Sequence, residues 1–304
     1  MPILSIHHLT RYRYRRPVGF GEHRIMFRPR EGHDVRLISA RLAITPEPGQ
    51  LRWVHDVFGN SVGVATFSTR AEELRFESTV VLDHEPAGGL DFPIQEDAET
   101  YPFSYNMEDL PDLARSIERQ YPDPDHTVER WARRFLGRDG PTGTRAMLAT
   151  MTQAIRDDFT YISRAERGVQ APTLTLKLGS GTCRDFAVLM IEAVRSLGLA
   201  AQFVSGYLYV PERSGRVGGG ATHAWLRVYL PGAGWVELDP TNGIIGNRDL
   251  IRVAIARDHR HVLPLHGTFT GFPSDDLGMT VTVRVSAVEP SNEAVFSSEV
   301  SSRE

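Results

Sequence analysis

"GSGTCRDFAVLMIEAVRSLG", residues 179–198, joins a glycine-rich turn to a long apolar run and contains the only cysteine of the chain, Cys183. Apolar side chains recur there at helical spacing, with Ala187, Ile191 and Val194 on one face and further apolar residues beside them. A helix with so much apolar surface is predicted to be buried. The sequence therefore places a single thiol in the first turn of a buried helix.

A lone cysteine is most often a small core residue, but this position also favours chemistry. A helix N-terminus favours the thiolate over the thiol, and its free N–H groups can bind a developing oxyanion. A nucleophilic thiol also needs a base and a group that orients that base. His223 and Asp239 are the candidates, because "THAWLRVYL" and "GWVELD" flank the turn "PGAG" and are predicted to form a hairpin.

The register of that hairpin decides whether His223 and Asp239 meet. If a five-residue loop pairs Tyr229 with Trp235, Asp239 lies diagonal to His223 on the same face of the sheet. A four-residue loop would pair Leu230 with Trp235 and put the two side chains on opposite faces. The sequence leaves both registers open. Two structural alternatives also stay open. His223 could be an ordinary histidine of a strand, and Asp239-Pro240 could simply end a strand.

The chain as a whole is predicted to be α+β. Residues 1–85 alternate in polarity between Gly and Pro breaks, which predicts an N-terminal antiparallel β-sandwich of short strands. Residues 86–142 read as a connector with helices, and residues 143–289 as a core of helices followed by antiparallel strands. Residues 290–304 are predicted to be a mobile tail.

Composition excludes several classes of protein and partner. Of its 304 residues, 41% are hydrophobic and 24% are charged, and the formal net charge is −4. A nucleic-acid-binding protein is expected to carry a basic patch, which this charge does not indicate. One cysteine excludes an intrachain disulfide and a Cys-rich zinc site. There is no apolar run of about 18 residues and no apolar leader after the first basic residues. We therefore expect a cytoplasmic protein with no membrane or nucleic-acid partner, no metal and no cofactor; its oligomeric state is open.

Four further residues are candidates for substrate binding. Trp225 and Trp235 would wall a substrate cleft, the alternative being that they are simple packing residues. Tyr161 and Gln170 are candidates, by chain position, for the second oxyanion donor beside the N–H of the cysteine, or are plain loop residues. The glycine-rich stretch "ERSGRVGGGATH", residues 212–223, is either a lid over the site or a loose strand connection.

Three motifs occur in an order that resembles the bacterial transglutaminase-like family: G-x-C-x-D-F-A, H-A-W and G-W-x-x-x-D-P-T-N. "HHLTRYRYRRPV" and "DVFGNSV" are similar to the β domain that precedes the catalytic core in that family. The resemblance implies a papain-like core with Cys183 as nucleophile, His223 as base and Asp239 as the group that orients the imidazole. Val188 stands where many relatives carry histidine. Nothing resembles the calcium sites of animal transglutaminases, so calcium is not implied.

Together these features predict a thiol-dependent enzyme that acts on peptide or protein substrates. It would form a thioester on Cys183 and pass the acyl group to water, as a protease or amidase does, or to an amine, as a transglutaminase does. The alternative is a peptide- or protein-binding module with the same fold and no turnover. The presence of all three triad residues favours the enzyme, because a binding module is free to lose them.

Overall fold

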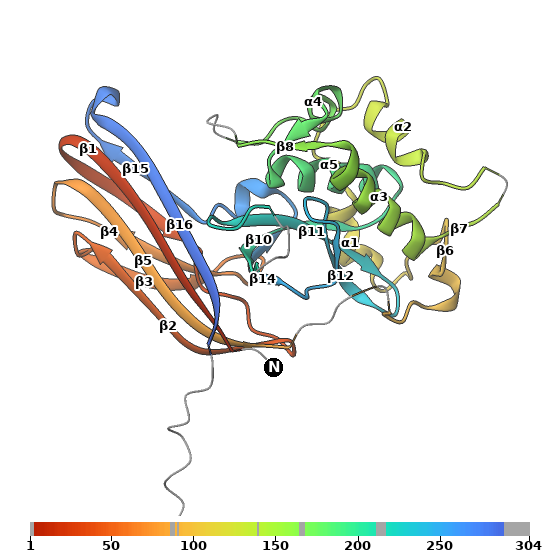
Figure 1. The fold of residues 1–304 in the computed structure, drawn as a ribbon, viewed down its shortest axis with the longest axis horizontal. Coiled ribbons are helices and arrows are strands. Elements are labelled where there is room, and N and C mark those ends of the chain that lie inside the picture. The colour runs from red at the N-terminus through yellow and green to blue at the C-terminus, as the bar shows by residue number, and fades with distance from the viewer. Residues whose placement is uncertain are drawn as a thin grey trace, which may run out of the picture.

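The architecture was obtained as a computed structural model, which describes residues 3–85, 89, 91–138, 140–163, 168–210 and 217–288. Two large β-sheets, two short two-stranded sheets and a group of helices make up this part of the chain. In Figure 1 the long strands of the first sheet lie on the left and α2, α3 and α4 on the right, with β10 and β14 between them. Among the described residues, no helix combines the length and apolar character needed to cross a membrane.

The first sheet is built around β1 (Ile3–Ile25), a strand of 23 residues. Its first part pairs with β5 (Ala71–His84) and β16 (Asp276–Val288), and its last part with β4 (Ser61–Thr66) and β15 (Leu265–Thr270). The remaining strands, β2 (Val35–Thr45) and β3 (Gln50–His55), lie at the two ends of the order β2-β5-β1-β4-β3. Buried and less buried residues alternate along the first third of β1, as a strand with one covered face requires.

The expected sandwich of short strands is not confirmed; the structure has one seven-stranded sheet with long strands. Pro17 does not end β1, because it falls where the pairing of β1 with β5 is interrupted, between Arg13 and Val18. At that interruption the missing N–H of proline costs no ladder hydrogen bond. The strand therefore continues past the proline.

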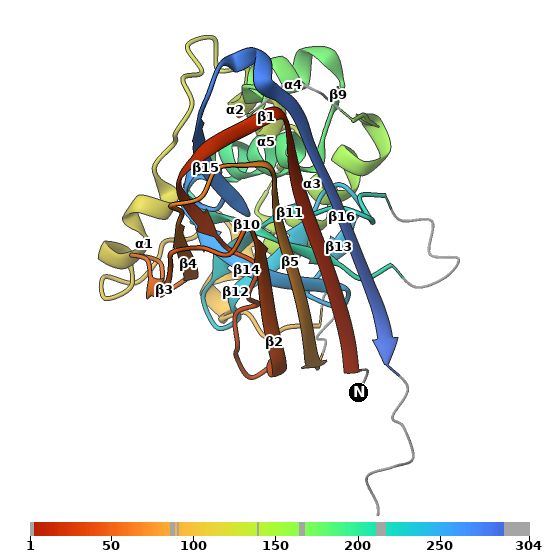
Figure 2. The same cartoon turned by 90° about the vertical axis from the view of Figure 1, so that its left-hand side faces the viewer.

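The last two strands join this sheet from the far end of the chain. β15 and β16 both pair with β1, so residues 265–288 complete the N-terminal sheet. The sequence predicted these residues as part of the catalytic core, since alternation alone does not reveal the pairing partner of a strand. Figure 2 shows β16 running beside the first part of β1, with which it pairs from Ile3 to Tyr14. The proposed tail, residues 290–304, lies outside the described residues.

The second sheet has five strands in the order β13-β12-β11-β10-β14. Its strands are β10 (Ala201–Leu208), β11 (His223–Leu230), β12 (Gly234–Asp239), β13 (Ile244–Ile245) and β14 (Leu250–Ala256). The helices are α1 (Leu110–Ile117), α2 (Thr127–Arg133), α3 (Thr144–Asp158), α4 (Pro172–Leu178) and α5 (Cys183–Ser196). Short pieces complete the fold: β6 (Thr100–Tyr101), β7 (Thr142–Gly143), β8 (Thr160–Tyr161), β9 (Ser180–Gly181), and the 3-10 turns Glu96–Ala98, His259–His261 and Pro273–Asp275.

The helix α5 is buried along almost its whole length, as its sequence predicts. Its apolar side chains share one core with the even-numbered residues of the β11–β12 hairpin, among them Leu226, Val228, Val236 and Leu238. The opposite face of the second sheet carries a separate small core around Trp225. The sheet is therefore covered on both faces, and α5 is held rigidly against one of them.

Candidate active site

The N-terminus of α5 positions Cys183 at the first helical residue. Thr182 is the N-cap, and its N–H and hydroxyl both donate to the Asp185 carboxylate, at 2.8 and 2.9 Å. The other oxygen of Asp185 accepts the N–H of Gln170 at 2.7 Å. Gly181 is required just before the cap, because a Cβ there would lie 2.8 Å from the Cβ of Asp185. This buried carboxylate fixes the turn that carries Cys183.

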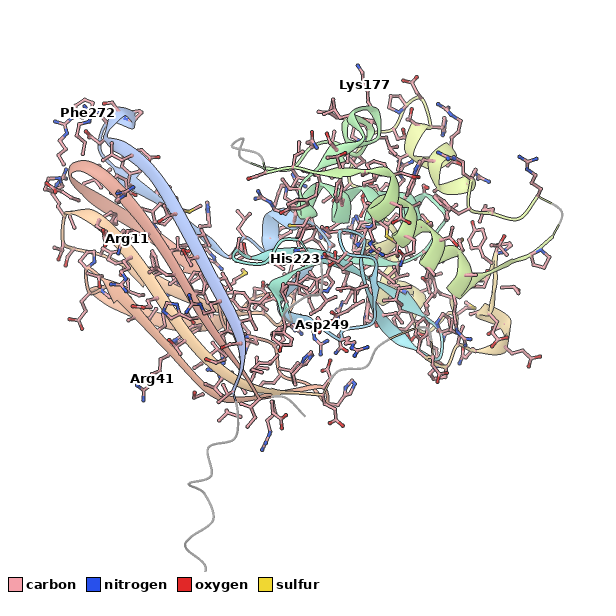
Figure 3. The ribbon with its side chains drawn as sticks, viewed as in Figure 1. Arg11, Arg41, Lys177, His223, Asp249 and Phe272 are labelled. Carbon is pink, nitrogen blue, oxygen red and sulfur yellow. The ribbon has the colours of Figure 1, made fainter. Side chains whose placement is uncertain are left out.

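The β11–β12 hairpin brings His223 and Asp239 together. Its register pairs Tyr229 with Trp235 and Leu226 with Leu238, which is the register of the five-residue loop. The imidazole Nε2 of His223 donates to Oδ2 of Asp239 at 2.8 Å, and both side chains are completely buried. Of the two registers that the sequence left open, the structure has the one that joins the pair. Figure 3 shows His223 in the interior of the molecule, between the first sheet and the helical end.

The Asp239 carboxylate accepts three hydrogen bonds, including the one from His223. Its Oδ1 accepts the N–H of Thr241 at 2.9 Å, and its Oδ2 accepts from the Asn242 side-chain amide at 2.8 Å as well as from His223. Burial alone would raise the pKa of Asp239, but the charge and hydrogen bond of His223, with the bonds from Asn242 and Thr241, lower it. Asp239 is therefore an ionised group in the protein interior.

The pKa of the His223 imidazole is shifted in the opposite direction, upward. Burial alone would lower the pKa of His223, but the charge and hydrogen bond of Asp239, and the nearby Cys183, raise it to about 10. Its second nitrogen, Nδ1, is buried and has no hydrogen-bond partner among the described residues. Since Nε2 is taken by Asp239, Nδ1 is the atom left to exchange a proton with the sulfur. Cys183, His223 and Asp239 thus lie together, from one helix end and two neighbouring strands.

Tyr161 lies close to this group. It stands in β8, which pairs in parallel with β9, so that Tyr161 is opposite Gly181, two residues before Cys183. Its side chain is 37% exposed, and burial together with the charges of Cys183 and Asp239 raises the pKa of its hydroxyl. The hydroxyl therefore stays a hydrogen-bond donor at neutral pH, as an oxyanion-hole group must.

Gln170, the other candidate oxyanion donor, is used elsewhere. Its main-chain N–H binds Asp185, and its side-chain amide donates to the carbonyl of Ser180 at 3.0 Å. The residue is buried, and a Cβ on Gly181 would lie 3.1 Å from its Nε2. The Ser180 carbonyl uses one of the two N–H groups of the amide, and the role of Gln170 as an oxyanion donor stays a prediction.

Trp225 contacts the triad from the protein interior. Its ring is completely buried and stacks on the imidazole of His223, with 5.9 Å between centroids and 29° between planes. The indole N–H donates to Glu237 at 2.8 Å. This tryptophan supports the histidine ring and lines no open cleft.

Trp235 does not border the triad. It lies four residues before Asp239 on β12, which is about 13 Å along a strand. Its ring is covered by the Arg227 guanidinium, 4.4 Å from the centroid, and meets Tyr229 edge-on at 5.5 Å. Trp235 is on the same face of the hairpin as Asp239, but its distance along the strand separates it from the site.

Two residues near the triad received no role in the sequence analysis, Asn242 and Gly218. Asn242 is the last residue of the D-P-T-N motif, and its amide binds Asp239. Gly218 belongs to the glycine-rich stretch 212–223, of which residues 212–216 lie outside the described residues. A Cβ on Gly218 would lie 2.8 Å from Nδ1 of His223. The D-P-T-N motif and the glycine-rich stretch can both be recognised in the sequence, but only the fold shows that they contact Asp239 and His223.

Within the described ranges, no three His, Cys, Asp or Glu side chains gather in a way suited to a metal ion. What the arrangement offers chemically is a thiol at a helix N-terminus, a buried imidazolium beside it and a carboxylate that orients the ring. Fold and site together define a protein with a papain-like, transglutaminase-like core.

Comparisons with known proteins agree with this class. Residues 4–83 match the model of the bacterial transglutaminase-like N-terminal region, and residues 129–240 that of the transglutaminase-like superfamily. An uncharacterized protein of Mycobacterium tuberculosis is 30% identical over 280 residues, covering 86% of this chain and 85% of its own. One from Mycobacterium leprae is 38% identical over 106 residues, 34% of this chain and 37% of its own. The chain belongs to the bacterial transglutaminase-like family.

A solved structure shows the same fold. A candidate cysteine protease from Cytophaga hutchinsonii matches with a TM-score of 0.70 and 18% identity, covering 95% of this chain and 92% of the other. The match therefore includes both sheets and the helices. Proteins of the transglutaminase-like superfamily are generally cysteine-dependent enzymes.

Proposed function

We propose that this protein is a thiol-dependent enzyme that cleaves amide bonds of peptides or proteins and passes the acyl group to water or to an amine. The observation that carries the proposal is the buried contact of His223 with Asp239, at 2.8 Å, beside the thiol of Cys183 at the N-terminus of α5. Burying two charges costs free energy even when they are paired, and strongly shifted pKa values occur preferentially at functional sites. This pair lies beside the thiol that would use it as a base.

The first half-reaction forms a thioester. The Cys183 sulfur attacks the carbonyl carbon of the amide, and the carbonyl oxygen takes up the negative charge. We assign the binding of that oxygen to the N–H of Cys183, at the start of α5, and to the hydroxyl of Tyr161, which stands opposite Gly181. His223 then gives its Nδ1 proton to the leaving nitrogen, the C–N bond breaks, and an amine departs.

The second half-reaction releases the acyl group. Water or an acceptor amine loses a proton to His223 and attacks the thioester, and Cys183 leaves as a thiolate. Asp239 keeps the imidazole oriented throughout and stabilises its charged form. The triad is the same for both acceptors, so hydrolysis and transamidation are both within its chemistry.

The test offers the protein a glutamine-containing peptide library together with a labelled primary amine. Label incorporation, ammonia release and peptide cleavage are followed for the wild type and for Cys183→Ala. Label that depends on Cys183 identifies a transferase, and ammonia or cleavage without label identifies a hydrolase. The absence of any product that depends on Cys183 would overturn the proposal and leave a peptide-binding module.

A further inference from the structure

A short loop covers Nδ1 of His223, the nitrogen that is left to exchange a proton with Cys183. We call residues 217–222 the covering loop; within it, Gly218 has φ +90°, a conformation that glycine adopts readily. The same glycine is so close that a Cβ on it would lie 2.8 Å from Nδ1 of His223. His223 itself is only 1% exposed. Main chain therefore occupies the space from which a leaving amine must reach Nδ1.

One side chain, Asn242, holds the start of this loop. Its Oδ1 accepts the N–H of Val217 at 2.9 Å, and its Nδ2 donates to the carbonyl of Val217 at 3.2 Å. The same Nδ2 donates to Oδ2 of Asp239 at 2.8 Å, the oxygen that also accepts from His223. A single amide thus joins the covering loop to the carboxylate of the triad.

A second anchor comes from the N-terminal sheet. The N–H of Val283, a buried residue of β16, donates to the carbonyl of Gly220 at 2.9 Å. The covering loop is therefore fastened at Val217 from the catalytic side and at Gly220 from the sheet. The two anchors differ in cost, because lifting the Val217 end breaks two hydrogen bonds to Asn242 and lifting the Gly220 end breaks one.

We propose that Asn242 is a positioning residue that latches the covering loop over His223, so that an acyl substrate reaches Cys183 only when the two Val217 hydrogen bonds open. In the closed form the loop keeps water from Nδ1, and in the open form a substrate nitrogen takes the place of Gly218. The inference rests on the proposed chemistry at Cys183. Its test measures access to the sulfur, not turnover, so the two can fail separately.

The test compares the wild type with Asn242→Ala by alkylation of Cys183, the only cysteine, with a bulky fluorescent maleimide. Hydrogen exchange of peptides covering residues 217–222 is measured alongside. We expect the bulky reagent to react about tenfold faster in the variant, because each hydrogen bond lost shifts an opening equilibrium by roughly two- to tenfold. Exchange should increase in the covering loop and stay unchanged in α5.

Gln153→Ala is the matched control. Its side-chain amide also holds the turn after β12, donating to the carbonyl of Gly243 at 3.0 Å, but it has no contact with Val217 or Asp239 in the described structure. The control should alkylate at the wild-type rate. Gly218→Ala is the second variant, because a methyl group there forces the loop away from His223 and should also accelerate the bulky reagent.

Two results would overturn the inference. One is a wild-type alkylation rate in Asn242→Ala, whatever the rate in Gly218→Ala. The other is exchange that increases throughout the core, α5 included, which would mean that Asn242 only stabilises the fold. If alkylation changes as expected while the peptide library yields no product, the latch stands and the proposed function falls.

Discussion

The charge on His223 depends first on Asp239. Burial opposes the imidazolium, and the charge and hydrogen bond of Asp239, together with the nearby Cys183, outweigh burial and raise the pKa of His223 to about 10. Replacing the Asp239 carboxylate by an amide of the same shape removes its negative charge but leaves the imidazole buried. Burial should then dominate and lower the pKa of His223.

In Asp239→Asn we expect the pKa of His223 to fall from about 10 to its ordinary 6.5 or below. Turnover should fall far more than stability, because the amide still bonds the ring but favours the wrong tautomer. An NMR titration of labelled histidines measures the pKa, with His223→Asn to assign the signal. An unchanged titration would mean that Asp239 does not set the charge of the ring.

The same pair makes stability depend on pH. The pKa of His223 is raised on folding, so its contribution is complete below 6.5 and is lost as pH rises through about 10. The pKa of Asp239 is lowered, so its contribution is present above 3.8 and is lost as pH falls further. The Tm difference between the wild type and His223→Asn should thus be largest between pH 3.8 and 6.5 and shrink toward pH 10. Calorimetry across that range would contradict the pairing if the difference stayed constant.

Among the elements, α5 depends on one carboxylate at its start. Asp185 accepts from Thr182 and Gln170 and is completely buried. Asp185→Ala should lower the free energy of unfolding by about 2–4 kcal/mol, since it removes a cap and leaves buried donors unpaired. Urea unfolding measures this, with Asp157→Ala on the exposed side of α3 as control, expected within about 0.5 kcal/mol of the wild type. Equal stabilities of the two variants would show that the cap contributes little.

At the scale of the whole molecule, one asparagine joins the two sheets. The side chain of Asn60, after β3, donates to the carbonyl of Ile255 at 2.8 Å and accepts its N–H at 2.9 Å. Ile255 lies in β14, the edge strand of the second sheet, so the amide continues the ladder of that edge. The same side chain accepts from Arg30 at 2.8 Å.

Asn60→Ala should therefore cost about 2–4 kcal/mol of stability, because it leaves both main-chain groups of Ile255 buried and unpaired. Chemical denaturation of the full chain measures the loss. Glu108→Ala, at an exposed turn, is the control and should change stability by less than about 0.5 kcal/mol. A loss at Asn60 no larger than that of the control would mean that the edge is satisfied in another way.

The sequence predicted the features that depend on a local pattern of residues. It did not predict the features that depend on residues far away along the chain. Helical spacing identified α5, and the two strands around "PGAG" limited the hairpin to two registers. The pairing of β16 with β1 was not predictable, because a period of two marks a strand without naming its neighbour. Trp225 was proposed as a cleft wall or a packing residue, and the sequence did not decide between them, because its burial depends on a second core that forms only after folding.

The central claim is that His223 activates Cys183 for acyl chemistry, and the rate of acylation tests it most directly. The protein is mixed with a nitrophenyl ester at pH 7, and intact mass is followed for the wild type, His223→Ala and Cys183→Ala. We predict one acyl group on Cys183 in the wild type, formed about 100-fold faster than in His223→Ala, the usual contribution of a general base. Equal rates in the wild type and His223→Ala, or the same adduct in Cys183→Ala, would contradict the account.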